Sequence, residues 1–234
     1  MAAQFAIEFA CAAMARSPIF QGMEPDELTP IAEAMVRRRY RRGEVIFHEG
    51  DPGDSLHVLV EGRVKIGRAS AEGEEAIVVI LSPGDTFGAI VLLDGASRSA
   101  TATAIEPTET LTMARSTFTE LVDGSAAFRW HVLGGVAKVV RRITDQLAEA
   151  HFLDLAGRLA LQLTRLAEAG SNGMTRDIPL GAALTQSDLA AMVGGTRQRV
   201  NRIIADFTDD GLLRNESGRI VVCDLDRLRA RAEW

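Results

Sequence analysis

A heptad pattern of apolar residues is the feature that most limits how this 234-residue chain can fold. Its members are spaced 3, 4, 3, 4 and 3 residues apart, and they are Leu133, Val136, Val140, Ile143, Leu147 and Ala150. Such spacing is typical of a helix that pairs with another helix along one seam. A helix of about 26 residues is near 39 Å long, which is too long for one small domain to bury. We therefore expect dimerisation through Leu133, Val136, Val140, Ile143 and Leu147. The alternative is a helix packed on the chain's own domain.

The region before this helix, residues 40–113, has the pattern of a β-sheet domain. Short apolar runs, such as residues 56–60 and 76–81, alternate with glycine-containing turns at roughly ten-residue spacing. Strands of this length and spacing predict a small antiparallel barrel or roll.

The region after the long helix predicts two short helices joined by a glycine turn. Thr185 followed by Asp188 is a capping pattern, and Thr196 is placed to cap the second helix after Gly194 and Gly195. In that second helix an apolar stripe faces the core, and Arg197, Gln198 and Arg202 point away from it. A predicted hairpin with a turn at residues 216–218 follows, and its Arg214 or Arg219 could contact phosphates. This arrangement meets the geometric demands of major-groove reading; the alternative is a helical hairpin with surface arginines and no DNA.

Composition restricts the function classes further. The net charge of −6 lies in residues 1–151, whereas residues 152–234 hold equal numbers of arginines and acids and no lysine. Arginine suits bidentate contacts with phosphate and guanine. The two cysteines form no metal-binding motif, which argues for a reducing cytoplasm and against a zinc site. No apolar run is long enough to span a membrane. No catalytic or metal-binding residues are predicted, so we do not expect an enzyme.

The sequence resembles the cyclic AMP receptor protein/FNR (CRP/FNR) superfamily of transcription regulators over nearly its whole length. The matching segments, in order, are RRGEVIFHEGDPGDSLHVLVEGRVKI, PGDTFGAIVLLDGASRSATATA, the long helix, FLDLAGRLA and LTQSDLAAMVGGTRQRVNRII. The resemblance implies an α+β fold with an effector-sensing antiparallel β-roll of the cyclic-nucleotide-binding type (1–124). A dimerisation helix (125–151) and a winged helix-turn-helix DNA-binding domain (152–234) would follow. It also implies a homodimeric regulator that binds a palindromic operator in double-stranded DNA, with RNA polymerase as the partner that activation would require.

The resemblance also suggests which residues contact DNA. These are Thr185, Gln186, Thr196, Arg197, Gln198, Arg199, Asn201 and Arg202. Arg197 and Arg202 match arginines suited to guanine O6 and N7. Gln198 stands where many relatives have glutamate and suits adenine instead. We therefore expect TGTGA-type half-sites that are altered at the base pair facing Gln198.

The expected effector site is a weaker match to the family. Its residues are Phe87, Gly88, Ala89, Ile90, Arg98 and Ser99, together with Ile143 and Thr144 on the long helix. Arg98 and Ser99 match the pair that holds a cyclic nucleotide's phosphate, whereas Ala89 replaces the glutamate that binds the ribose. Losing that charged hydrogen bond, worth roughly 1.5–3 kcal/mol, should weaken cyclic AMP binding about 10- to 100-fold.

The sequence is compatible with three kinds of effector site: one for a cyclic nucleotide, one for another small anion, or a roll that binds no effector at all. A further alternative is a cyclic-nucleotide-binding module that acts on a protein partner. The iron–sulfur cluster of the FNR branch is excluded, because Cys11 alone cannot supply four thiolates.

Overall fold

The computed structural model describes residues 2–71, 73–171, 173–181, 184–216 and 219–232. The chain forms two compact units. The first comprises Met1–Arg68 and Val78–Arg141, and the second comprises Ala69–Ile77 and Arg142–Trp234. The division falls within the long helix, so the expected three-part organisation with boundaries at both ends of that helix stays a prediction.

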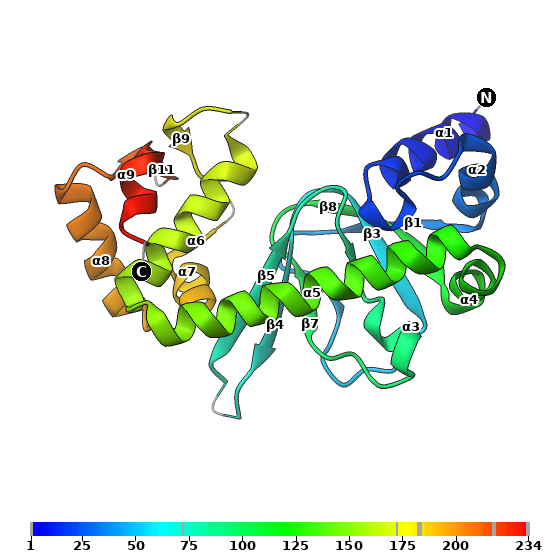
Figure 1. Cartoon of the computed structure of the whole chain (residues 1–234), viewed down its shortest axis with the longest axis horizontal. Coiled ribbons are helices and arrows are strands. Elements are labelled where there is room, and N and C mark those ends of the chain that lie inside the picture. Colours follow the sequence, from blue (N-terminus) through cyan, green and yellow to red (C-terminus); the bar gives the residue numbers. More distant parts are fainter. Residues whose placement is uncertain (1, 72, 172, 182–183, 217–218, 233–234) are drawn as a thin grey trace. The chain divides into compact units, whose positions relative to one another are not determined.

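Two four-stranded sheets form the roll of the first unit, with strand orders β1-β8-β3-β6 and β2-β7-β4-β5 (Figure 1). Every strand pair whose register is described is antiparallel, as the sequence predicted. The strands are β1 (Val36–Tyr40), β2 (Val45–Phe47), β3 (Ser55–Glu61), β4 (Val64–Ala69), β5 (Glu75–Leu81), β6 (Thr86–Phe87), β7 (Thr101–Ala104) and β8 (Thr108–Ala114).

The central strand β3 separates two cores, because successive side chains of a strand point to opposite faces. Leu56 and Val58 join a core with the surrounding helices, whereas Leu59 joins Val64 and Phe87 in a second core. The helices of this unit are α1 (Ala2–Ala15), η1 (Pro18–Phe20), α2 (Pro25–Ala34), α3 (Ile90–Asp94) and α4 (Arg115–Gly124).

The long helix α5 (Ala126–Phe152) confirms that a long helix follows the roll (Figure 1). Phe128 and Val132 in its first turns are buried. The side chains that follow along the predicted seam are exposed: Leu133 by 56%, Val136 by 38%, Val140 by 57%, Ile143 by 47% and Leu147 by 68%. Within the part of the chain that the structure describes, neither α5 nor another helix is long and apolar enough to cross a membrane.

Among the described residues of the second unit, the four helices that follow α5 and a three-stranded sheet pack around one core. The sheet order is β10-β11-β9, so β11 lies between two edge strands. The elements are α6 (Leu155–Gly170), β9 (Arg176–Pro179), α7 (Gln186–Val193), α8 (Arg197–Asp209), β10 (Leu213–Glu216), β11 (Arg219–Asp224) and α9 (Leu225–Ala230).

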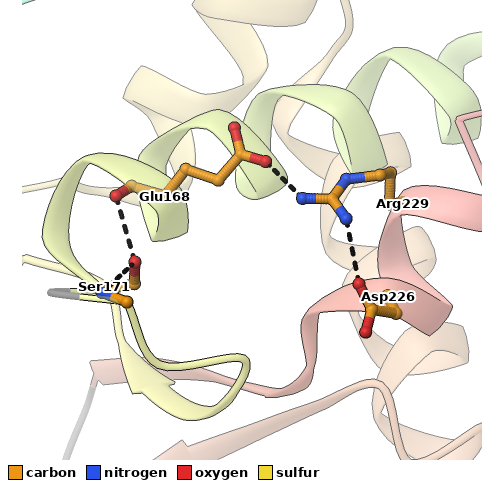
Figure 2. Close-up of polar contacts among 5 residues, drawn as sticks. Glu168, Ser171, Asp226 and Arg229 are labelled. Atoms are coloured by element: carbon orange, nitrogen blue, oxygen red, sulfur yellow. Dashed lines mark hydrogen bonds and ion pairs between the residues drawn. The ribbon is translucent and has the colours of Figure 1, made fainter.

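Polar side chains tie the last helix of this unit to its first. Figure 2 shows Arg229 of α9 between two carboxylates, Glu168 of α6 at 2.6 Å and Asp226 of its own helix at 2.9 Å. The backbone carbonyl of Glu168 also accepts a hydrogen bond from Ser171 Oγ at 3.2 Å, where α6 ends. These contacts supplement the apolar core that Leu159, Leu163 and Leu228 share.

Candidate nucleic-acid interface and effector site

The turn between α7 and α8 depends on both of its glycines. Gly194 ends α7 in the left-handed conformation, with φ of +64°, which glycine adopts without steric cost. Gly195 is needed for a different reason: a Cβ there would lie 2.8 Å from Leu155 Cδ1 of α6. The turn thus fixes how α8 leaves α7 and how closely both helices approach α6.

Both helices begin with the caps that the sequence predicted. Thr185 Oγ1 accepts a hydrogen bond from the Asp188 amide at 3.1 Å, and the Asp188 carboxylate accepts one from the Thr185 amide at 2.9 Å. Thr196 Oγ1 accepts a hydrogen bond from the Arg199 amide at 3.3 Å. The hydroxyl groups of Thr185 and Thr196 therefore orient the two helices, and contact with DNA through them stays a prediction.

The outer face of α8 carries most of the predicted base-reading side chains. Val200 and Phe207 are buried against the core, which turns the opposite face of the helix outward. Arg197, Gln198, Arg199 and Arg202 on that face are exposed, while Gln186 and Asn201 are half-buried. Buried Asn201 Oδ1 has no hydrogen-bond partner among the described residues. The structure thus groups cations and one amide on the first two turns of α8.

Arg98 occupies the centre of the predicted effector site and is only 5% exposed. Its Nη1 donates to the carbonyl oxygen of Gly88 at 2.7 Å, and its Nη2 donates to that of Ser55 at 2.8 Å. The guanidinium carbon lies 4.1 Å from the ring centroid of Phe47. Burial lowers the pKa of Arg98, and the carboxylate of Asp54 opposes that shift. The side chain therefore links two backbone segments inside the roll.

The backbone approaches Arg98 closely at two glycines. A Cβ at Gly88, where φ is +77°, would lie 2.6 Å from Arg98 Nη1, and one at Gly53 would lie 2.9 Å from Arg98 Nε. That Nε is buried without a hydrogen-bond partner in the described part of the chain. Around this point Phe87 is buried, Ala89 is half-buried, and Ile90 and Ser99 are exposed.

Sequence reasoning missed two residues of this region. Arg115 donates to the carbonyl oxygens of Gly53 at 2.7 Å and Val91 at 3.1 Å, so it holds α3 against the loop before β3. His57 stacks on Phe87 with ring centroids 4.9 Å apart, and its Nδ1 lies 3.1 Å from Thr112 Oγ1. Neither residue belongs to a recognisable motif; only the strand alternation, which turns His57 to the same side as Leu59, could have indicated one of them.

His57 should make the stability of the roll depend on pH. Its pKa is lowered from 6.5 to about 4, because burial disfavours the imidazolium and Arg98 repels it. Between these two values the unfolded chain binds a proton that the folded chain does not. The free energy of unfolding should therefore fall as the pH falls through this window, by at most about 1.4 kcal/mol per pH unit.

This dependence can be measured by urea unfolding at pH values between about 7 and 5, with His57→Phe as the matched variant. The variant keeps an aromatic ring but cannot titrate, so its curve against pH should be flatter than that of the natural chain. Parallel curves would show that His57 does not cause the effect.

The predicted contact of Ile143 and Thr144 with the effector also stays a prediction. Both lie on the part of α5 that belongs to the second compact unit, whereas Arg98 belongs to the first. Ile143 is exposed, as are the other seam residues of α5.

Comparisons with known proteins match both parts of this arrangement. A family model described as "Cyclic nucleotide-binding domain" matches residues 37–125, and one described as "Crp-like helix-turn-helix domain" matches residues 157–231. The "CRP-like cAMP-activated global transcriptional regulator" of Mycobacterium tuberculosis is 34% identical over 225 residues, covering 94% of this chain and 98% of that protein. The chain belongs to the CRP/FNR family. It is a DNA-binding transcription regulator with a helix-turn-helix.

Further relatives agree with this CRP/FNR assignment. The "Cyclic AMP receptor protein" of Thermus thermophilus is 29% identical, over 89% of this chain and 94% of its own length. The structure of FixK2 from Bradyrhizobium japonicum has a TM-score of 0.77 at 20% identity, covering 86% of this chain and 98% of that one, and therefore shows the fold. The predicted fold class, with its antiparallel roll, long helix and C-terminal helix-turn-helix, is confirmed.

Proposed function

We propose that this CRP/FNR regulator acts in the cytoplasm as a homodimer on a palindromic operator, by binding rather than by catalysis. The two copies would pair through the exposed seam of α5, and α8 of each copy would enter the major groove of one half-site. Where the protein activates transcription, RNA polymerase would be its partner. The exposed apolar side chains along α5 support the dimer, because a monomer would leave all of them in water.

The observation that carries this proposal is the cationic outer face of α8. Arg197, Gln198 and Arg202 are exposed on the first two turns after a capped helix start, the position from which a recognition helix contacts base edges. We infer that the two arginines contact guanines and that Gln198 contacts an adenine.

Selection of bound duplexes from a random DNA pool tests the proposal. The expected result is a twofold-symmetric sequence whose half-sites lie about one helical turn apart, about 10 base pairs from centre to centre. The base pair facing Gln198 should differ from that of the TGTGA-type half-site. Recovery of no duplex, or of an asymmetric one, would contradict the proposal.

The residues at Arg98 fit only the phosphate end of a cyclic nucleotide. The guanidinium and the exposed Ser99 hydroxyl offer donors suited to a phosphodiester, and Arg98 Nε has a hydrogen-bond donor to spare. At the ribose end, Ala89 has no acceptor. We therefore infer an anionic effector, with cyclic AMP binding more weakly than to a site that has the carboxylate.

Restoring that carboxylate should strengthen cyclic AMP binding. Ala89→Glu is expected to lower the dissociation constant by about 10- to 100-fold, because the ribose hydroxyl regains a charged acceptor. Isothermal titration calorimetry on the natural chain and the variant measures the change, and Ala71→Glu adds the same charge at an exposed turn. Equal affinities of all three proteins for cyclic AMP would show that the ribose does not bind beside Ala89.

A second candidate is a regulator that needs no effector, and one observation favours it. Both Nη atoms of Arg98 are bonded to backbone carbonyls, so the side chain already stabilises the roll. A thermal-shift screen with cyclic AMP, cyclic GMP and cyclic di-GMP distinguishes the two candidates. A ligand at 100 times its dissociation constant raises the free energy of unfolding by about 2.7 kcal/mol, whereas a regulator without an effector shows no shift. A module that acts only on a protein partner would instead bind no DNA in the selection.

A further inference from the structure

Arginines of the second unit fall into two groups according to their partners. Most arginines outside α8 form an ion pair with a carboxylate or a hydrogen bond to a backbone carbonyl among the described residues. These are Arg158, Arg165, Arg176, Arg214, Arg227, Arg229 and Arg231. The exposed arginines of α8, Arg197, Arg199 and Arg202, form no such bond within the part of the chain that the structure describes.

One member of the paired group, Arg214, lies on the wing formed by β10 and β11. It forms an ion pair with Asp177 of β9, and its Nε donates to Glu216 Oε1 at 2.7 Å. The hydrogen bonds that Arg214 donates to Glu216, and to a lesser extent to Asp177, raise the pKa of Arg214. Because two carboxylates converge on one guanidinium, the group of three carries a net charge of −1.

The sheet register explains how these side chains meet. Arg214 pairs with Val221 of the central strand, and Val221 pairs with Pro179 of β9. The ion pair with Arg214 itself shows that the Asp177 side chain lies on the same face of the sheet as Arg214. Arg214 therefore reaches diagonally across β11, and the ion pair bridges the two edge strands of the sheet.

The backbone at Asp177 gives an independent sign that this contact is specific. Asp177 has φ of +53°, and among the described residues other than glycine it is the one with positive φ. Aspartate and asparagine tolerate this conformation better than other residues with a Cβ, yet it still costs free energy. The chain thus accepts a strained residue at the position whose carboxylate reaches Arg214.

We infer that Asp177 and Glu216 prevent Arg214 from contacting DNA phosphates and so limit the non-specific DNA affinity of this regulator. This inference rests on the proposed function, because it assumes that α8 binds the duplex. For Arg214 to contact a phosphate, it would have to exchange two carboxylates for one phosphate. Both carboxylates would then lie unpaired beside the DNA backbone, which repels them. Arg214 therefore contributes little attraction, so the cationic contact comes from α8 and from the exposed Arg219 at the start of β11.

The test measures binding to a duplex of unrelated sequence by fluorescence anisotropy over a range of salt concentrations. Asp177→Asn/Glu216→Gln keeps side-chain shape and releases Arg214. One new phosphate contact should raise affinity on the order of tenfold near 0.1 M salt and steepen the log–log salt slope by about 0.9. Glu216→Gln alone, at an exposed site, serves as the second variant should the double variant unfold.

Two further variants decide whether Arg214 is responsible. Arg214→Gln alone leaves both carboxylates unpaired, so the affinity itself should fall, but the log–log salt slope should not flatten, since the side chain makes no phosphate contact. One lost phosphate contact would flatten the slope by about 0.9. Arg214→Gln added to the double variant should restore the natural affinity and slope. A salt slope flattened by about 0.9 in the single variant, or a gain in affinity that persists in the triple variant, would overturn the inference. If instead the natural chain bound no duplex, the proposed function itself would fail.

Discussion

Arg197→Ala/Arg202→Ala should abolish operator recognition while leaving the fold intact. Each bidentate contact to a guanine is worth about 1–3 kcal/mol. Losing two in each half-site removes four from the operator complex, about 4–12 kcal/mol, and should lower affinity by at least roughly 10³-fold. Both side chains are exposed, and neither belongs to the apolar core of the unit. The loss should therefore appear in DNA binding and not in thermal unfolding.

The measurement is fluorescence anisotropy with the selected operator and with an unrelated duplex. Arg176→Gln/Arg231→Gln is the matched control, because it removes the same charge from exposed arginines that are paired with Asp224 and Asp210. The control should bind the operator within about threefold of the natural chain. Should the α8 variant lose the same factor on both duplexes, its arginines would contact phosphates and not base edges.

Placing charge on the α5 seam should produce the second large effect. Val140→Glu/Leu147→Glu puts carboxylates opposite each other in the proposed dimer, where they repel and cannot be solvated well. In the single chain both positions are more than half exposed, so the chain should still fold. A monomer binds one half-site without the linked second contact, and operator affinity should fall by about 10²- to 10⁴-fold.

Analytical ultracentrifugation measures the assembly, and anisotropy measures operator binding. Lys138→Gln/Arg141→Gln lowers the charge of α5 by the same amount at exposed positions off the seam, and should remain dimeric. A dimer of the seam variant at micromolar concentration would show that the two copies associate through another surface.

The local parts of this structure could be predicted from the sequence. Each of these parts depends on residues within a few positions of each other, where the conformational preferences of single residues act directly. Examples are the helix caps, the Gly194–Gly195 turn and the apolar spacing from Leu133 to Leu147. Strand alternation likewise predicted the roll. These patterns, with the family resemblance, were enough to predict the fold and the helix that carries the cationic face.

The partners of the charged side chains could not be predicted in this way. Arg98 bonds to Ser55, 43 residues away, and Arg214 bonds to Asp177, 37 residues away. A sequence shows that an arginine is present but not which carbonyl or carboxylate the folded chain brings to it. From the sequence, Arg98 could bind an anion or pair with an acid, and Arg214 or Arg219 could contact a phosphate. In the structure the guanidinium groups of Arg98 and Arg214 form hydrogen bonds within their own units.

The two carbonyl contacts of Arg98 affect how genetic experiments on this regulator should be designed. A strain that carries Arg98→Ala would lose a support of the roll whether or not the cell makes an effector, so its phenotype would not distinguish an unstable protein from an insensitive one. Comparing protein abundance with regulation in the same strain separates the two. Ala89→Glu, at a side chain that forms no hydrogen bond, is expected to alter ligand binding without removing that support.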